Sequence, residues 1–277
     1  MPLLSILTAT HAQPDSYLPE TAASVAVQDL PAGWELEWIV QEDGASPAAG
    51  DLLAQMPHVR YEANHAQLGP AVTRNLALAR ARGSLVQLLD HDDLLLPGAL
   101  ATLIPLFLEH PIHWAVGQAD DLLPDGTRRS YRSALPYGAI APGLVNQWAT
   151  AHEANWPIHC AGLMLRTTTL RALGGWIAAP SDDDIVMFAA VSQITTGYNE
   201  PTLTWLYRQH ANQIHRSSTW QARSAHGRRI ALQRATAAEA AQLNLPAPPL
   251  DDPDSDVHVG PPAKEARSAA LLAGRSE

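Results

Sequence analysis

Apolar runs of strand length alternate with helical patterns through the first 110 residues of the chain. The predicted strands are 3–9, 34–40, 59–62 and 85–89. The predicted helices are 17–30, 51–56, 70–82 and 97–109. The run at 85–89 is almost continuously apolar, as expected of a strand buried on both faces of a sheet. Proline opens the helix at 70–82, and Gly83 is expected to end it. Strands alternating with helices predict an α/β protein with a mostly parallel sheet.

The second half of the chain has a weaker pattern. The predicted strands there are 113–117 and 158–166, with a turn at 120–126. Helices are predicted within 137–151 and at 168–173, 184–191 and 217–242. From residue 245 onward Pro, Asp, Ala and Ser dominate, which is typical of a flexible tail.

Charge and composition narrow the classes of partner. With 277 residues and a formal net charge of -10, the chain lacks the basic balance of a protein that binds nucleic acid or an anionic membrane. No apolar stretch approaches the roughly 18 residues needed to span a bilayer, and no basic segment typical of a signal peptide opens the chain. The single cysteine, Cys160, is consistent with a reducing compartment. We therefore expect a cytoplasmic protein without an integral membrane segment. The oligomeric state stays open.

Three carboxylates follow the apolar run at 85–89. Asp90, Asp92 and Asp93 stand within four positions of one another, and ligands of open α/β sheets bind at the carboxyl ends of strands. Carboxylates this close repel one another unless a cation lies between them. Mn²⁺ or Mg²⁺ carrying a substrate phosphate is the simplest occupant. The structural alternative is an acidic loop in which Asp92 or Asp93 caps the next helix.

Two more polar residues are expected at the same edge of the sheet. Glu42 follows the run at 34–40, where a carboxylate can accept hydrogen bonds from a base or a ribose. Its alternative is an ordinary acidic turn. Arg74 lies one turn into the helix that Gly69 and Pro70 open, and helix N-termini attract anions. Arg74 could reach a phosphate or the acidic cluster, although an arginine at such a position is more often simply solvated.

The second half contributes an acidic triplet and a pair of histidines. Asp182, Asp183 and Asp184 precede an apolar helical run, so one of them could be a general base if its carboxylate faces a cleft. Helix capping is the alternative. His210 and His215 could ligate a metal or approach a phosphate, whereas surface histidines without a role are the alternative.

Together these segments resemble family 2 glycosyltransferases of the GT-A fold. The usual family motifs are a strand ending in a DDGS-like turn, a G-x-x-x-x-R-N helix, a strand ending in L-D-x-D-D and a later E-D pair. The matching segments, in the same order, are 42–44, 69–75, 88–93 and 182–183. Glu42 departs from the first Asp of the turn, and Asp182 departs from the Glu of the E-D pair.

The resemblance implies a GT-A (Rossmann-like) domain and its activity. The domain would cover 1–215, with a nucleotide-binding half at 1–110 and an acceptor-binding half at 111–215. A C-terminal helix at 216–244 and a flexible tail at 245–277 would follow. The implied activity is metal-dependent, inverting transfer of a sugar from a nucleotide-sugar donor to an acceptor hydroxyl. A UDP-sugar is favoured as donor, and a dTDP-sugar is the alternative.

The resemblance also implies roles for single residues. The implied contacts to the nucleotide-sugar are Thr8, Glu42, Arg74, Asp90 and His210. The implied ligands of Mn²⁺ or Mg²⁺ are Asp92, Asp90 and His215. Asp183 would be the base that activates the acceptor hydroxyl, with Asp182 in reserve. His159 and Trp176 would line the acceptor side, and Asp93 would be structural.

Two other functions are weighed against this one. A sugar-phosphate nucleotidyltransferase also holds magnesium with carboxylates on an α/β sheet, but that class usually has a glycine-rich basic loop after the first strand. Residues 8–14 are neither glycine-rich nor basic. A catalytically inactive nucleotide-sugar binding module would account for the departures at Glu42 and Asp182, although both positions keep a carboxylate.

Overall fold

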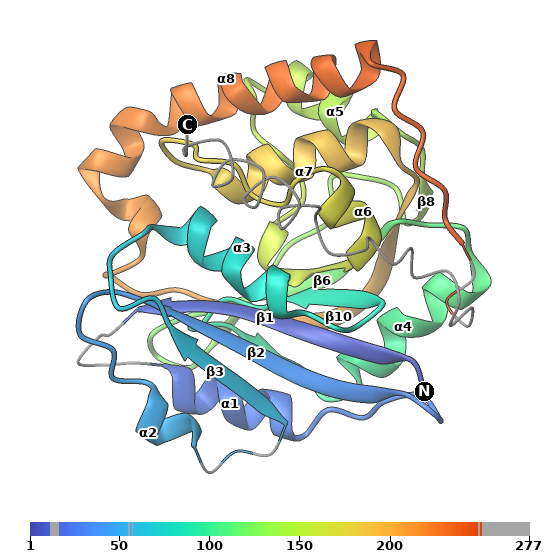
Figure 1. Ribbon diagram of the computed structural model, residues 1–277. Helices are drawn as coiled ribbons and strands as arrows, with labels where there is room; N and C mark the ends of the chain where they lie inside the picture. Colours follow the sequence, from blue (N-terminus) through green and yellow to red (C-terminus); the bar gives the residue numbers. More distant parts are fainter. Residues whose placement is uncertain (12–16, 55, 57, 249, 251–277) are drawn as a thin grey trace, which may run out of the picture.

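The computed structural model describes residues 1–11, 17–54, 56, 58–248 and 250 (Figure 1). Ten strands in these residues form one sheet with the order β3-β2-β1-β4-β9-β6-β10-β5, in which β7 also pairs with β6 and β8 with β10. The strands are β1 (Leu3–His11), β2 (Glu35–Asp43), β3 (Val59–Ala63), β4 (Leu85–Leu88), β5 (Leu94–Leu95), β6 (Trp114–Leu122), β7 (Arg128–Ser130), β8 (Gly138–Ile140), β9 (Leu163–Arg166) and β10 (Gly197–Arg208).

The strand directions bring most carboxyl ends to one edge of the sheet. β3, β2, β1 and β4 are parallel to one another. β9 is antiparallel to both β4 and β6, so β6 runs in the same direction as β4, and β10 is parallel to β6. The carboxyl ends of β1, β2, β4, β6 and β10 therefore share one side, which we call the carboxyl edge. The predicted mostly parallel α/β fold is confirmed.

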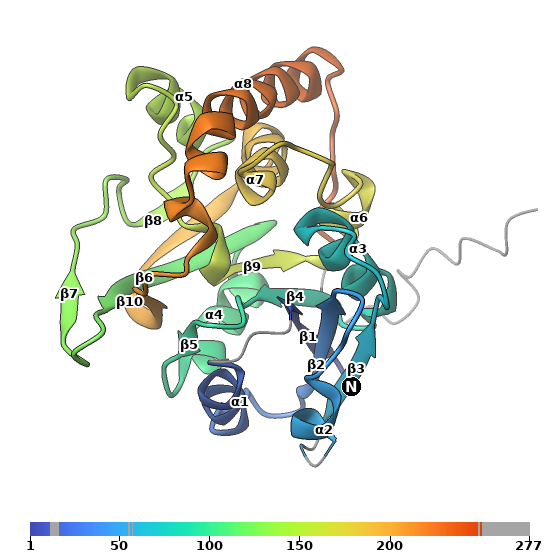
Figure 2. The same cartoon turned by 90° about the vertical axis from the view of Figure 1, so that its left-hand side faces the viewer.

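Helices cover both faces of this sheet (Figures 1 and 2). The helices are α1 (Leu18–Ala26), α2 (Gly50–Leu53), α3 (Pro70–Arg80), α4 (Ala99–Glu109), α5 (Leu144–Ala151), α6 (Thr167–Ala172), α7 (Asp183–Ile194) and α8 (Ser218–Ala240), with 3₁₀ turns η1 (Cys160–Gly162) and η2 (Ile214–Arg216). One apolar core forms between the sheet and α1, α2 and α4, and a second between the sheet and α3, α5, α6 and α7. Burying apolar side chains on both faces explains why the strands read as continuous apolar runs.

The helix α8 extends the second layer by packing against α7. Val186 and Ala189 of α7 form a small core with Ala231 and Ala235 of α8. Close approach continues at Gly227, where an added Cβ would lie 2.4 Å from the carbonyl oxygen of Ser181. Small residues on α8 therefore fix the segment that leads into α7.

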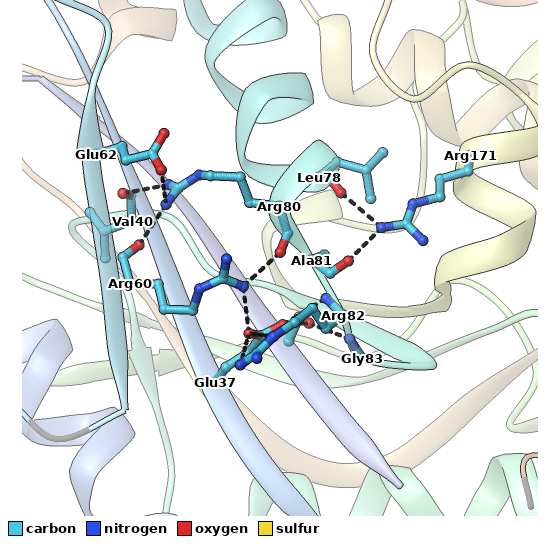
Figure 3. Close-up of polar contacts among 11 residues, drawn as sticks. Glu37, Val40, Arg60, Glu62, Leu78, Arg80, Ala81, Arg82, Gly83 and Arg171 are labelled. Carbon is cyan, nitrogen blue, oxygen red and sulfur yellow. Dashed lines mark hydrogen bonds and ion pairs between the residues drawn. The ribbon is translucent and has the colours of Figure 1, made fainter. Parts of the chain in front are cut away.

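Arginines hold the C-terminal end of α3 (Figure 3). Arg60 donates to the carbonyl of Arg80 at 2.7 Å, and Arg171 donates to the carbonyl of Leu78 at 3.2 Å. The last carbonyls of a helix have no partner within the helix, and cations near them are favoured by the helix dipole. These contacts tie α3 to β3 and to α6.

Glu37 of β2 binds two arginines near the C-terminal end of α3. Its buried carboxylate accepts hydrogen bonds from Ser5 at 2.7 Å, from Arg60 at 2.8 Å, and from the backbone and Nε of Arg82 at 2.7 and 3.0 Å. Figure 3 shows Arg60 and Arg82 converging on this carboxylate. We call Glu37, Ser5, Arg60 and Arg82 the Glu37 cluster.

Three differences from the predicted elements have physical causes. α3 ends at Arg80 rather than through a left-handed Gly83, which instead leaves room for the backbone nitrogen of Ser5, 2.6 Å from an added Cβ. The start of the predicted strand at 158–166 is the η1 turn, and the predicted turn at 120–126 begins inside β6. β10 was not predicted because Pro201 interrupts its pattern, and its register with β6 shifts there.

The C-terminal helix is confirmed as α8, while most of the predicted tail, residues 249 and 251–277, lies outside the described residues. Among the helices of the described chain, none has the length and hydropathy to cross a membrane.

Candidate active site at the carboxyl edge

The acidic cluster lies where the strand order reverses direction, because β1 and β4 are adjacent and the chain winds outward from them to either side. This is the expected position of a ligand site in an open α/β sheet. β4 is entirely buried, and Asp90 and Asp92 follow it as partly exposed residues. The buried strand thus delivers two carboxylates to the carboxyl edge.

Asp93 has a structural role, as predicted. It is fully buried, and its Oδ1 accepts the backbone N–H of Arg208 at 2.9 Å. The Arg208 guanidinium donates to the carbonyl of Asp92 at 2.8 Å, so the end of the acidic segment 90–93 is fixed to the end of β10. Burial raises the pKa of Asp93 well above its ordinary value, and the charges of Asp92 and Asp90 raise it further.

Arg74 joins two segments of the site. Its guanidinium lies 2.8 Å from Oδ2 of Asp183 and 3.1 Å from Oδ1 of Asp90. Burial alone would lower the pKa of Arg74, but Asp183 and Asp90 outweigh it and raise the pKa above its ordinary value. Burial likewise acts to raise the pKa of Asp90, and the charge of Arg74 reverses this and lowers it. Arg74 and Asp90 are therefore both ionised at neutral pH.

The position of Arg74 follows from how α3 begins. Gly69 caps the helix with φ +84, a left-handed conformation that suits glycine. The carboxylate of Asp43 accepts the backbone N–H groups of Leu68 at 2.7 Å and of Gly69 at 3.0 Å. Asp43 thus fixes the loop that leads into α3.

Asn75 ties α3 to the segment before α7. Its side chain accepts the backbone N–H of Trp176 at 3.0 Å and donates to the carbonyl of the same residue at 2.5 Å. Asn75 therefore links α3 to the segment before α7, and its neighbour Arg74 on the same helix contacts Asp183.

The acidic triplet divides between the site and α8. Asp183 faces Arg74, whereas Asp182 accepts a hydrogen bond from Ser181 at 2.9 Å and lies next to Ser224 of α8. Burial, then the charge of Asp183, raises the pKa of Asp184 to about 7. Of the two predicted bases, Asp183 is the one that the structure places beside Arg74.

The two predicted histidines have different partners. Nε2 of His210 lies 2.8 Å from Oδ2 of Asp92, so the structure brings these two predicted site residues together. Nδ1 of His215 lies 3.2 Å from the hydroxyl of Tyr207 instead, with no ion pair to a carboxylate in the part of the chain that the structure describes.

A metal fits the donor chemistry of this edge but has no complete protein cage. Asp90 and Asp92 supply hard carboxylate oxygens within one turn of chain. Within the described residues, no group of three His, Cys, Asp or Glu side chains is arranged to hold a metal ion. Mg²⁺ typically uses one or two carboxylates and completes its shell with water and substrate phosphates. The residues present are therefore compatible with a metal that binds together with a phosphate ligand.

Other predicted contacts point into the protein. Thr8 is fully buried, and its hydroxyl accepts the indole N–H of Trp38 of β2 at 2.9 Å. Glu42 is also fully buried, and its carboxylate accepts the hydroxyl of Tyr61 at 2.5 Å and the backbone amides of 48–49. The expectation that Trp176 lines the acceptor side is wrong, because its side chain is 2 % exposed and packs in the second core.

A cavity of about 450 Å³ was not predicted, and Tyr207 in its wall directly precedes Arg208, whose backbone N–H donates to Asp93. It is bounded by β6, β10, the segment after β7 and the segment before η1. His159 and Tyr207 form part of its wall, with ring centroids 4.2 Å apart. His159 thus lies at a ligand-sized cavity. The sequence did not indicate Tyr207 as a cavity residue, because the strand that carries it, β10, was not predicted. We call this the β6–β10 cavity.

The chain belongs to glycosyl transferase family 2, because the sequence model of that family matches residues 5–163, more than half of its length. It is 37% identical over 98 residues to the putative teichuronic acid biosynthesis glycosyltransferase TuaG of Bacillus subtilis, covering 33% of this chain and 36% of TuaG. It is 32% identical over 132 residues to the uncharacterized protein y4gI of Sinorhizobium fredii, covering 46% of this chain and 14% of that protein.

Solved structures share the fold. TarS 1-349 of S. aureus in complex with UDP-GlcNAc superposes with a TM-score of 0.62 at 19% identity, covering 79% of this chain and 61% of the TarS chain. The UDP complex gives a TM-score of 0.60 at 19% identity, covering 76% and 61%. The predicted GT-A fold is therefore confirmed. The chain spans little more than a third of TuaG and about three fifths of TarS 1-349.

Proposed function

We propose that this chain is a metal-dependent, inverting glycosyltransferase that moves a sugar from a nucleotide-sugar to an acceptor hydroxyl. The observation that carries the proposal is the Arg74 bridge, which joins Asp90 at the end of β4 to Asp183 at the start of α7. One guanidinium thereby couples a donor-binding carboxylate to a candidate base. Family membership and the UDP-GlcNAc bound to the similarly folded TarS favour a UDP-sugar as donor.

The donor would lie along the carboxyl edge between β1 and β4. Asp92 and Asp90 would hold Mn²⁺ or Mg²⁺, which when bound would neutralise charge on the departing diphosphate. Arg74 adds a permanent positive charge, and electrostatic stabilisation of this kind is usually the largest catalytic contribution. His210 would orient Asp92 through their 2.8 Å contact and would approach the diphosphate from the segment after β10.

Thr8 and Glu42 would act on the donor indirectly. Both side chains are buried, and Glu42 fixes the backbone at 48–49. They would shape the edge that the base and ribose contact. His215 would support the site through Tyr207 rather than as a direct metal ligand.

Asp183 would act as the general base. Its carboxylate takes the proton of the acceptor hydroxyl while that oxygen attacks the anomeric carbon. The bond from the anomeric carbon to the phosphate oxygen breaks, and its electron pair leaves with the nucleoside diphosphate. A single displacement inverts the anomeric configuration. Asp182 is turned toward Ser181 and α8, so we assign it to fixing the start of α7.

A thermal-shift screen of nucleotides with and without Mn²⁺ tests the donor site. We expect stabilisation by UDP that depends on Mn²⁺, and at 100 times Kd this amounts to about 2.7 kcal/mol. Asp92→Ala should lose the Mn²⁺-dependent part, whereas Asp29→Ala, an exposed aspartate, should keep it. If Asp92→Ala kept the full effect, the metal assignment would be wrong. Stabilisation by dTDP alone would move the donor to a dTDP-sugar.

Release of UDP from a panel of UDP-sugars with added glycans tests the base. Asp183→Asn should abolish turnover but still bind UDP, while Asp182→Asn should retain most of the turnover. The opposite ranking would assign the base to Asp182. Wild-type protein that binds UDP but releases none from any donor would instead be an inactive binding module.

A further inference from the structure

The β6–β10 cavity adjoins the proposed reaction centre. Its volume of about 450 Å³ is within the usual range of small-molecule sites. Tyr207 in its wall directly precedes Arg208, whose backbone N–H donates to Oδ1 of Asp93 at 2.9 Å and whose Nε donates to the carbonyl of Asp92 at 2.8 Å. A molecule in this cavity would therefore lie near the donor edge.

Buried side chains hold the walls of the cavity in place. Asn199 of β10 is buried and donates to Ser133 Oγ at 2.9 Å and to the carbonyl of Pro136 at 3.0 Å. Gln118 of β6 donates to the Asn199 side chain at 2.9 Å. The loop after β7 is thus fixed to β6 and β10, the two strands of the cavity wall.

The cavity carries an excess of positive charge. Asp121 on its floor is buried and accepts hydrogen bonds from Arg129 and, at 2.6 Å, from the hydroxyl of Tyr131. The Arg129 guanidinium lies 5.4 Å from the centre of the Tyr131 ring. The negative charge of Asp121 therefore compensates the positive charge of Arg129 alone.

Arg132 lines the same cavity and is exposed. It makes no ion pair or hydrogen bond with any residue that the structure describes. Figure 2 shows β7 and its flanking segments projecting beyond the rest of the sheet, and the side chain of Arg129 on β7 is 57% exposed. Among the described residues, Arg132 is thus an unpaired positive charge at a cavity of a chain whose net charge is -10.

We infer that the β6–β10 cavity binds the acceptor and that this acceptor carries an anionic group, a phosphate or a carboxylate, which Arg132 holds beside the Arg129–Asp121 pair. The inference rests on the proposed glycosyl transfer. Charge-assisted hydrogen bonds from arginine to phosphate or carboxylate are short and directional, so Arg132 both attracts the acceptor and orients it. The acceptor hydroxyl would then face His159, Tyr207 and the donor edge.

Titration with small probes tests this site in the full chain, with UDP and Mn²⁺ at saturation so that the donor site is occupied. The probes are glycerol 3-phosphate, D-glucuronate and neutral glycerol. We expect the wild-type protein to bind one of the anions saturably and glycerol not at all. Arg132→Gln should weaken that anion about tenfold, and Arg132→Lys less than that, because lysine keeps the charge but not the guanidinium fork. Arg223→Gln, an exposed arginine of α8, is the matched control and should change nothing.

The probes separate the two anionic sources and the two proposals. Tighter binding of glycerol 3-phosphate assigns a phosphate, and tighter binding of glucuronate assigns a carboxylate. Equal anion affinity in wild type and Arg132→Gln, or equal binding of glycerol, overturns the inference. UDP is titrated separately on the same variants, and its affinity should not change in Arg132→Gln. If wild-type protein fails to bind UDP, the proposed function fails, and the anion titrations without UDP still test the cavity.

Discussion

Glu37 should contribute more to stability than any exposed carboxylate of the same strand. Its side chain is 4% exposed and accepts hydrogen bonds from Arg60 and Arg82. In Glu37→Gln the charge is lost and an amide N–H₂ faces two guanidinium groups. A hydrogen bond to a charged group contributes about 1.5–3 kcal/mol. The Arg82 side chain is 66% exposed and regains water, so we count the Arg60 contact fully and the Arg82 contact in part. The expected loss is about 2–3 kcal/mol.

Urea unfolding and thermal melts at pH 7 measure this loss. At about 2–4 °C per kcal/mol, Glu37→Gln should melt roughly 4–12 °C below the wild type. Glu35→Gln, at an exposed position two residues earlier, should stay within about 0.5 kcal/mol of the wild type. A Glu37→Gln protein as stable as Glu35→Gln would refute the importance of the Glu37 cluster.

The pH dependence of this difference has a definite sign. Burial acts to raise the pKa of Glu37, but hydrogen bonds from Ser5, Arg82 and Arg60 outweigh it and lower the pKa below its ordinary value of 4.5. The contribution is thus fully present above pH 4.5 and is lost as the pH falls through the folded-state pKa. The gap between wild type and Glu37→Gln should therefore narrow in acid.

Two further changes test the buried histidine and the packing of α8. Burial lowers the pKa of His113 from 6.5 to about 4, so its neutral form stabilises the fold above pH 6.5 and this contribution is lost as the pH falls from 6.5 to 4. His113→Gln should reduce the drop in Tm between about pH 7 and pH 4.5, whereas the exposed His226→Gln should not. Gly227→Ala places a Cβ 2.4 Å from the Ser181 carbonyl, and we expect a loss of about 1–3 kcal/mol with lower turnover but unchanged UDP affinity. Ala225→Ser likewise adds one heavy atom, but on the exposed side of α8, so it should change stability by no more than about 0.5 kcal/mol and leave turnover and UDP affinity unchanged. An equal effect of both variants would contradict the packing argument.

The nucleotide-binding half was predictable because its signals are local. Buried parallel strands produce apolar runs, and the glycine and proline at 69–70 mark the start of α3. β10 was not predictable in the same way, because Pro201 breaks its pattern and the strand is recognised only by its pairing with β6 and β5. Pairings of this kind depend on residues far apart in sequence.

In the site, too, the local signals were predictable and the contacts between distant segments were not. The sequence indicated that Arg74 could reach the carboxylates, but which aspartate of the triplet faces Arg74 depends on how α7 packs against α8. The burial of Glu42 could not be anticipated, since its backbone partners at 48–49 lie in a loop without a recognisable motif and its side-chain partner Tyr61 comes from the separate strand β3. The sequence did not show that Arg129 and Arg132 line a cavity, because this depends on where β7 and the loop after it lie in the fold.

β9 sets the spacing between the two halves of the sheet. It is the one reversed strand between β4 and β6, and it starts at the carboxyl edge directly after η1. At the level of Gln87 and Ala115, which both pair with Met164, β4 and β6 are therefore two strand spacings apart, about 10 Å, and β6 continues to Leu122 beyond the end of β4. A ligand bound only to Asp90 does not contact Asp121, and a ligand bound only to Asp121 does not contact Asp90. In the proposed reaction, a donor at Asp90 and an acceptor at Asp121 would together have to span the separation that β9 sets.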